Sequence, residues 1–295
     1  MPTQKIERRT FLKYSAAAAA AGNLMGALTA AAAPQTKAKW RKGIKINMLP
    51  KNLTDAEKFQ LAKKCGFEGI DAVPLTDMET ARKQAQLARD VGIPIHGVVF
   101  GWWPPFDKTA GQDKKCLDDM ENALRCAQAM NADTVLLVPT RLTETFGYAD
   151  AYQHSQKLIR KLIPLAEELK IIIAIENVWN KFLLSPLEFA RYLDELESPW
   201  VRAYFDVGNV IIHGFAQDWI RTLGKRIIKL DLKDFKRQGY EFVNLLDGDV
   251  NWPEVRKALN EIGFEGWMTA ELRGGDEAYL TDLSQRIDRI IKGIS

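Results

Sequence analysis

The sequence predicts a single (β/α)8 barrel, and three observations support this prediction. Short apolar runs alternate with amphipathic stretches from about residue 44 to the end of the chain. Eight such pairs can be counted, and eight pairs in roughly 250 residues is the usual size of a (β/α)8 barrel. Several of the apolar runs are nearly continuous, as in residues 171–175, which is typical of strands buried on both faces of a parallel sheet.

Each expected strand is a short apolar run bounded by polar or turn-forming residues. In chain order, the expected strands are residues 44–49, 69–73, 93–99, 134–139, 171–176, 201–206, 227–231 and 267–271. The main alternative is a doubly wound open sheet, which usually has a glycine-rich turn after its first strand. The corresponding turn here, residues 48–52, contains no glycine, which favours the barrel.

The expected helices show apolar positions at helical spacing between these strands. They are residues 54–65, 77–91, 114–130, 149–169, 185–196, 218–223, 252–262 and 277–291. Two have clear start signals: Thr54 with Glu57 forms a capping box, and Ser185 is followed by proline at the first helical position. No second domain or low-complexity linker is expected after residue 40.

The first 33 residues have the pattern of an export signal. Arg8 and Arg9 precede Phe-Leu-Lys, and a weakly hydrophobic, alanine-rich run follows over residues 16–33. This pattern resembles a bacterial twin-arginine signal. A membrane-spanning helix could be this short, but alanine, glycine and threonine contribute little transfer energy. We therefore expect residues 1–33 to be removed, a short segment at 34–43, and a barrel at 44–295. The exported protein should be periplasmic, without stable membrane association.

The charge distribution excludes several classes of partner. The net charge of the chain is +3, and residues 1–33 alone carry four basic residues and one acidic residue. The remaining chain is therefore neutral, so no net field would attract nucleic acid or an anionic membrane. The three cysteines are too few and too scattered for a disulfide framework or a C-x-x-C site.

Four consecutive expected strands end with a carboxylate: Glu176, Asp206, Asp231 and Glu271. Neighbouring parallel strands lie about 4.8 Å apart, so the four groups can converge at the rim of a barrel. Their repulsion requires either protonation or a cation, and all-oxygen ligands favour Mg, Mn or Ca over zinc. The alternative is that each acid pairs with a basic residue, with Lys229, Lys233 and Arg273 as candidates.

Several stretches carry a family resemblance. Residues 175–183, 204–209, 232–234, 248–252 and 266–272 resemble the sugar isomerase and epimerase superfamily with the xylose isomerase-like barrel, in particular ketose 3-epimerases and hexulose-phosphate isomerases. The resemblance implies a divalent metal, usually Mn or Mg, bound by a glutamate, an aspartate, a histidine and a glutamate after strands five to eight. Glu176, Asp206 and Glu271 match this pattern. Asp231 stands where the family has histidine, and Asn209 stands where many members have histidine.

The resemblance also implies a reaction. Glu176 and Glu271 would flank the reacting carbon, one removing a proton next to the carbonyl of a ketose and the other returning it, through an enediolate. Epimerisation and aldose–ketose isomerisation both fit this scheme, and a related lyase or dehydratase would share its first step. A non-catalytic, exported carbohydrate-binding barrel is a further alternative. Endonucleases share the barrel but have histidine-rich sites, whereas this chain has three histidines. Export favours an unphosphorylated sugar.

Further residues are candidates for substrate contact because they follow strands or precede loops at the expected barrel mouth. They are His96, Trp102, Trp179, Asn180, Asn209, Lys233 and Arg273. The alternative for His96 is a hydrogen-bonded core position, and the alternative for Trp102 is a loop that packs on its own barrel. His154 and His213 are expected at the surface without a function, and residues 233–237 are expected to form a solvated loop.

Overall fold

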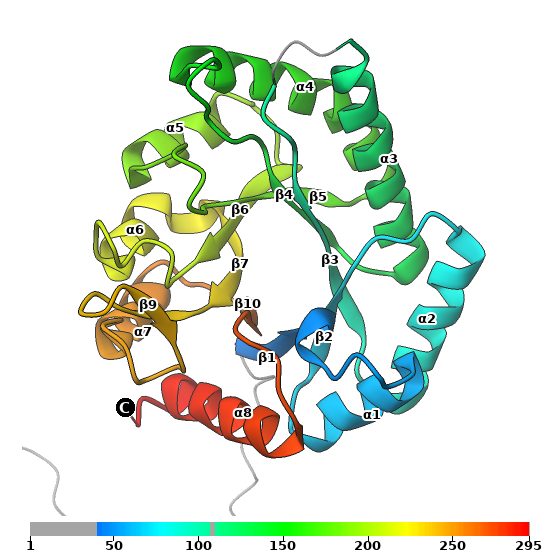
Figure 1. Ribbon diagram of the computed structural model, residues 1–295, viewed down its shortest axis with the longest axis vertical. Helices are drawn as coiled ribbons and strands as arrows, with labels where there is room; N and C mark the ends of the chain where they lie inside the picture. The colour runs from blue at the N-terminus through cyan, green and yellow to red at the C-terminus, as the bar shows by residue number, and fades with distance from the viewer. Residues whose placement is uncertain (1–39, 107–109, 295) are drawn as a thin grey trace, which may run out of the picture. The chain divides into compact units, whose positions relative to one another are not determined.

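Eight parallel strands form a closed barrel in the computed structural model, which describes residues 40–106 and 110–294 (Figure 1). The barrel confirms the predicted fold class, and an open sheet is excluded by the pairing of the first strand with the last. Around the barrel the order is β1-β10-β7-β6-β5-β4-β3-β2. The strands are β1 (Trp40–Lys45), β2 (Gly69–Ala72), β3 (Ile95–Trp102), β4 (Thr134–Val138), β5 (Ile172–Glu176), β6 (Val201–Asp206), β7 (Ile227–Leu232) and β10 (Gly266–Ala270).

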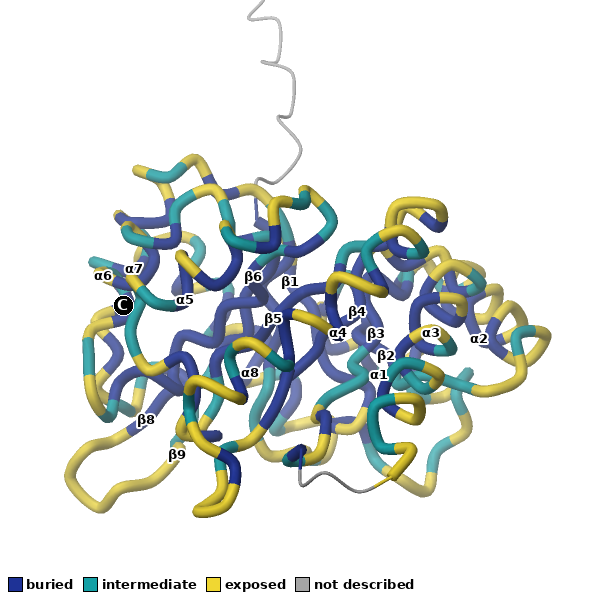
Figure 2. The backbone as a smooth tube through the Cα atoms, turned by 90° about the horizontal axis from the view of Figure 1, so that it is seen from above, coloured by how far each residue is buried: buried dark blue, intermediate teal, exposed yellow. Residues whose placement is uncertain are grey.

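The helices form a ring outside the strands, and their outward faces are exposed while the strands are buried (Figure 2). They are α1 (Asp55–Lys64), α2 (Met78–Val91), α3 (Gln112–Met130), α4 (Tyr148–Leu169), α5 (Pro186–Asp194), α6 (Ala216–Leu223), α7 (Trp252–Glu261) and α8 (Glu277–Lys292). Both predicted start signals are confirmed. Thr54 forms the capping box with Glu57, and the Ser185 hydroxyl accepts from the backbone N–H of Glu188.

The barrel begins earlier than the sequence pattern predicts. Strand β1 starts at Trp40, inside the segment expected to precede the barrel, and Ile46–Met48 form a 3-10 turn, η1, instead of continuing the strand. Trp40 is buried, and its indole N–H donates to the carbonyl of Phe264 at 2.9 Å, which ties the first strand to the far end of the chain. The expected export signal lies outside the described residues.

A short antiparallel hairpin was not predicted. It consists of β8 (Asp234–Lys236) and β9 (Glu241–Val243) and lies between β7 and α7. The prediction of a solvated loop at 233–237 is therefore wrong for Asp234 and Phe235, which are both fully buried. The Asp234 carboxylate accepts hydrogen bonds from the backbone of Leu246 and Val250 and from the indole of Trp252, so it fixes the hairpin to the loop that leads into α7.

The N-terminal half of the barrel is filled by two stacked rings. His96 lies on Trp267 with ring centroids 4.0 Å apart and an interplanar angle of 9°. Gly43 and Gly69 create the space for these rings, since a Cβ at Gly69 would lie 2.5 Å from the Trp267 ring. The Lys229 ammonium is buried beside His96 and pairs with Asp133 at 2.6 Å. This end of the barrel is therefore a packed core.

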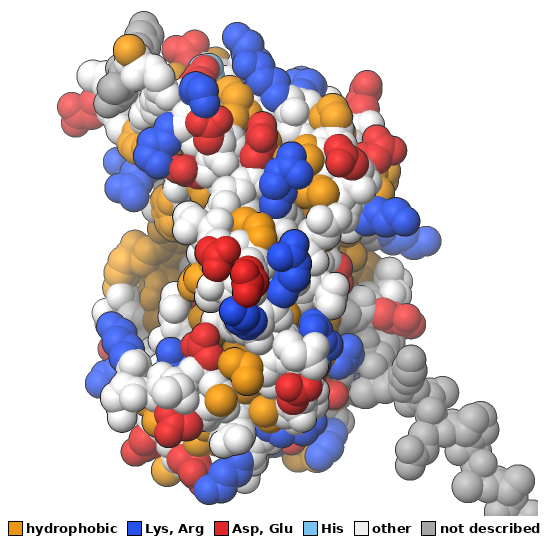
Figure 3. Space-filling model, turned by 90° about the vertical axis from the view of Figure 1, so that its right-hand side faces the viewer, with side chains coloured by type: hydrophobic (Ala, Val, Ile, Leu, Met, Phe, Trp, Pro, Cys, Tyr) orange, Lys and Arg blue, Asp and Glu red, His pale blue; other side chains and the backbone are white. Residues whose placement is uncertain are grey.

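The outer surface has no region dominated by one sign of charge on the face that carries α2 and α3, where acidic and basic side chains are interspersed (Figure 3). This distribution agrees with the neutral charge calculated for residues 34–295. Among the helices that the structure describes, none is long and apolar enough to cross a membrane.

The stacked rings make Gly69 sensitive to substitution. Gly69→Ala should lower the free energy of unfolding by about 1–3 kcal/mol, because the added methyl group overpacks Trp267. Thermal denaturation measures this loss as a fall in Tm. Gly147→Ser is the matched control, because Gly147 precedes α4 and a Cβ there meets nothing within 4 Å. Equal Tm values for Gly69→Ala and the control would show that the stacked rings of His96 and Trp267 do not limit the space at Gly69.

Candidate active site at the C-terminal ends of the strands

Four carboxylates converge at the C-terminal ends of β5, β6, β7 and β10. Glu176, Asp206, Asp231 and Glu271 each offer one oxygen, and these oxygens all lie within 4.8 Å of one another. The first three side chains are buried and the Glu271 side chain is 29% exposed, so Glu271 faces the barrel mouth. The structure thus brings together the four acids that the strand pattern selected.

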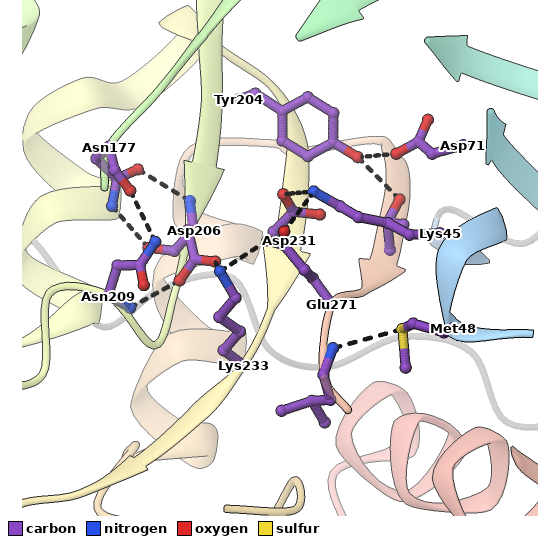
Figure 4. Close-up of polar contacts among 12 residues, drawn as sticks. Lys45, Met48, Asp71, Asn177, Tyr204, Asp206, Asn209, Asp231, Lys233 and Glu271 are labelled. Atoms are coloured by element: carbon purple, nitrogen blue, oxygen red, sulfur yellow. Dashed lines mark hydrogen bonds and ion pairs between the residues drawn. The ribbon is translucent and has the colours of Figure 1, made fainter. Parts of the chain in front are cut away.

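Two lysines contact three of the four acids, Asp206, Asp231 and Glu271 (Figure 4). The Lys45 ammonium, from the end of β1, lies 2.7 Å from Asp231 Oδ2 and 3.0 Å from Glu271 Oε1. The Lys233 ammonium lies 3.1 Å from Asp206 Oδ2 and 2.7 Å from Glu271 Oε2. When all four carboxylates are ionised, these lysines leave a net charge of −2 in a largely buried space. Glu271 is the acid that both lysines contact.

The donor set fits a divalent metal ion. Two buried carboxylate oxygens, Glu176 Oε1 and Asp231 Oδ1, have no polar partner within the described residues. Lys45 contacts Asp231 Oδ2 and therefore leaves Asp231 Oδ1 free. Asp206 Oδ2 and Glu271 Oε2 are paired with the Lys233 ammonium. Oxygen ligands with a residual charge of −2 suit Mn or Mg better than zinc.

The two glutamates have opposite proton affinities. Burial and the neighbouring Glu271 charge raise the pKa of Glu176 to about 8. Burial would also raise the pKa of Glu271, but the ammonium groups of Lys45 and Lys233 outweigh it and hold this pKa at about 2. Near neutral pH and without a metal, Glu176 therefore carries a proton and Glu271 is ionised. Two carboxyl groups with separated pKa values are a common arrangement for acid and base roles.

Burial raises the pKa of the other two acids. For Asp231 the effect is large and exceeds the opposing influence of Lys45, and for Asp206 the opposing charge is Lys233. A cation bound among these acids would favour their ionised forms, as Lys45 and Lys233 do in part.

Two asparagines fix Asp206. The Asn177 side chain exchanges hydrogen bonds with the backbone of Asp206, donating to its carbonyl and accepting from its N–H, both at 2.9 Å. The backbone N–H of Asn209 donates to Asp206 Oδ1 at 2.7 Å, and the Asn209 side chain donates to the carbonyl of Asn177. Asn209 therefore helps to position Asp206, and its side-chain amide is hydrogen-bonded to the backbone carbonyl of Asn177.

A polar layer lies beneath the carboxylates. The Tyr204 hydroxyl lies 2.5 Å from Asp71 Oδ2 and 3.0 Å from Thr269 Oγ1, and all three side chains are buried. The Lys45 ammonium lies 5.7 Å from the centre of the Tyr204 ring. This layer separates the carboxylates from the stacked rings, and the Tyr204 ring faces the Lys45 ammonium.

The other residues predicted to contact substrate fall into two groups. His96 is not placed to do so, because it stacks on Trp267 in the N-terminal half of the barrel, where burial and Lys229 hold its pKa well below its usual value. Asn180 is also turned away from the site: its amide donates to the carbonyl of Thr140 and accepts from the N–H of Phe182. Both are core positions, the alternative considered for His96.

The remaining candidates lie on the loops of the barrel mouth. Trp179 is 39% exposed, donates to the carbonyl of Asn209 and packs against Phe242 of β9. Trp102 is exposed at the end of β3, with the Arg141 guanidinium 5.0 Å from its ring. Arg273 follows Glu271 and lines a cavity, but the described contacts do not join it to the four acids.

Lys45 and Asn177 belong to the site but were not predicted from the sequence. A lysine between Ile44 and Ile46 in an apolar strand was a usable signal, because a buried ammonium requires an acidic partner. Its partner Asp231 is 186 residues away, and only the pairing of β1 with β10 and of β10 with β7 brings the two together. Asn177 directly follows Glu176, but its role depends on the neighbouring strand.

Two cavities meet the carboxylates through Glu271. The smaller has a volume of about 180 Å³ and lies over the ends of β1 and β2, with Lys45 and Asp71 in its wall. The larger has a volume of about 730 Å³ and lies between β9 and the segment from Glu271 to Tyr279, with Lys233 in its wall. Glu271 is thus accessible to a small molecule from the C-terminal face of the barrel, where (β/α)8 enzymes carry their active sites.

Comparison with known proteins agrees with this geometry. A family profile described as xylose isomerase-like TIM barrel matches residues 59–290. A second profile, the twin-arginine translocation pathway signal sequence, matches residues 5–25 and marks the chain for export.

The similar proteins include sugar epimerases. L-ribulose-5-phosphate 3-epimerase UlaE of Escherichia coli is 23% identical over 246 residues, which cover 76% of this chain and 84% of that protein. Among solved structures, D-psicose 3-epimerase in the presence of D-fructose has a TM-score of 0.72 at 17% identity and covers 86% of this chain and 99% of its own. The 3-keto-D-glucoside 4-epimerase YcjR of E. coli has a TM-score of 0.69 at 14% identity, with 86% and 99% coverage.

The profile match spans most of the described barrel, and the relatives match along most of their own length. The closed barrel of eight parallel strands is the fold that these structures share. The chain therefore belongs to the xylose isomerase-like TIM barrel family, with sugar epimerases among its relatives.

Proposed function

We propose that this protein is a divalent-metal-dependent sugar epimerase or isomerase that acts on an unphosphorylated ketose or keto-sugar in the periplasm. The observation that carries the proposal is the set of four carboxylates, which offer one oxygen each within 4.8 Å of one another and leave a charge of −2 beside Lys45 and Lys233 when all four are ionised. Mn or Mg would be held by Glu176, Asp206, Asp231 and Glu271. When bound, the metal would polarise the carbonyl and stabilise negative charge on its oxygen.

The residues of the chain supply the proton transfers. Glu271 is ionised, partly exposed and contacted by both cavities, so it can accept the proton from the carbon next to the carbonyl. Glu176 is the second glutamate of the pair and would return a proton to the reacting carbon. For a 2-ketose, removal of the C3 proton and return to the other face of C3 gives the epimer, whereas removal of a C1 proton and return to C2 gives an aldose.

Lys45 and Asp231 act together in this proposal. Asp231 uses one oxygen for Lys45 and keeps the other for the cation, so the added negative charge of an aspartate at this position is offset within the barrel. The Lys233 side chain is 17% exposed and holds Asp206 and Glu271 from the side of the larger cavity. The proposed location in the periplasm rests on the export signal. The proposal of an unphosphorylated substrate rests on that location, because phosphorylated sugars are scarce outside the inner membrane.

The pH dependence of metal binding tests the donor set. Below about pH 8, Glu176 holds a proton that must leave before its carboxylate can bind the cation. Mn affinity should therefore rise by up to about 10-fold per pH unit between roughly pH 6 and 8 and level off above, with proton release. Isothermal titration calorimetry in buffers of different ionisation enthalpy measures both quantities. Glu176→Gln should flatten the profile, and a flat profile in the parent protein would contradict the assignment.

Removal of Lys45 tests the compensation. Without metal, Lys45→Met should lower the free energy of unfolding by about 3–5 kcal/mol, because Asp231 loses its buried partner. Asp231→Asn in the same chain should restore part of this loss, and Mn should stabilise Lys45→Met more than the parent. Lys42→Met is the control, since Lys42 is buried but pairs with Asp288 outside the site. Denaturant unfolding measures these free energies. If the losses from Lys45→Met and Asp231→Asn simply add in the double variant, Lys45 does not compensate the charge of Asp231.

A sugar panel tests the reaction. The Mn-loaded protein should exchange the proton next to the carbonyl of a free ketose with solvent deuterium, which NMR detects. Glu271→Gln should lower the rate by about 100-fold or more, as expected for loss of the general base. A preference for phosphorylated sugars would overturn the substrate class. Binding without any exchange would support the alternative of a non-catalytic carbohydrate-binding barrel.

A further inference from the structure

The larger cavity extends well beyond the reacting groups. It begins at Glu271 and Lys233 and continues to Phe242 of β9 and Tyr279 of α8. Its volume of about 730 Å³ lies in the range of pockets that enclose drug-sized ligands. A single hexose is smaller than such ligands, so a monosaccharide that reacts at Glu271 would leave much of this cavity to solvent.

The outer wall of the cavity is rigidly placed. Phe242 lies on the β8–β9 hairpin, which Asp234 holds through the backbone of Leu246 and Val250 and the indole of Trp252. The Phe242 ring is 42% exposed, although Trp179 at 4.9 Å and Phe235 at 5.3 Å pack against it. An aromatic ring that is held by other rings and still open to solvent is a suitable surface for stacking a sugar.

The cavity is not built for a phosphate. The α8 N-terminus, which borders it, already has an anionic cap: the Asp276 carboxylate accepts from the N–H of Tyr279 at 3.0 Å. The Lys233 ammonium is engaged by Asp206 and Glu271. Arg273 is therefore the basic side chain left in this wall, beside the polar amide of Asn244. Aromatic and uncharged polar groups favour a neutral carbohydrate over an anion.

We propose that the substrate is a glycoside of the keto-sugar, whose second sugar occupies the cavity between Phe242 and Tyr279. This inference rests on the proposed function, since Glu271 is the point at which the reacting sugar and the second sugar would join. It specifies the substrate class: disaccharides or other glycosides that contain an oxidised or ketose unit, rather than free monosaccharides.

The test compares D-fructose with maltulose and isomaltulose, which carry a glucose unit on O4 and O6 of fructose and keep the carbonyl free. Dissociation constants on the Mn-loaded protein come from titration calorimetry, and kcat/KM comes from proton exchange followed by NMR. At least one disaccharide should bind about 10-fold or more tightly than fructose. Phe242→Ala and Tyr279→Ala, from different elements, should each reduce this preference by at least about 3-fold.

Tyr240→Ala is the matched control, because Tyr240 packs on Trp179 and Phe235 but does not line the cavity. Its preference should equal that of the parent. Equal affinity for fructose and both disaccharides, or equal effects of Phe242→Ala and Tyr240→Ala, would overturn the inference. Absence of exchange with every sugar would instead refute the proposed reaction, while the binding preference would still report on the cavity.

Discussion

The repulsion among four carboxylates in one buried space is the constraint on which the rest of this structure depends. Each acid would be destabilising without a partner, because burial disfavours the ionised form. Lys45 and Lys233 offset half of the charge that four ionised acids carry, and both contact Glu271. The resulting site has a defined deficit of positive charge, which a divalent cation would fill. The same lysines keep Glu271 ionised while Glu176 holds its proton.

The barrel supports this arrangement in layers. Stacked rings and the buried Lys229, which pairs with the exposed Asp133, fill the N-terminal half, and the glycines of β1 and β2 make room for the rings. Above them, Asp71, Tyr204 and Thr269 form a hydrogen-bonded layer. The carboxylates lie on top, with their backbone held by asparagines after β5 and β6. The four carboxylates therefore gather at the C-terminal end of the barrel, which the cavities reach.

The sequence predicted the barrel and its acids for a physical reason. Parallel strands buried on both faces are apolar throughout, so a carboxylate at the end of each of four successive strands is conspicuous, and closure of the barrel brings these ends together. The alternation of residues along the strand did not show which way His96 points. Its stacking on Trp267 of β10 depends on the space that the glycines of β1 and β2 leave. The β8–β9 hairpin was missed because Asp234, read as solvated, is a buried acceptor of local hydrogen bonds. Lys45 was missed because its partners come from the far end of the chain.

Crystals grown with Mn and measured at the Mn absorption edge would show whether the four acids bind a metal ion. We expect one anomalous peak per chain within coordination distance of Glu176, Asp206, Asp231 and Glu271, with Lys45 still bound to the second oxygen of Asp231. If no peak is present, or if the peak excludes Asp231 while Lys45 holds both of its oxygens, these four acids are not the metal site.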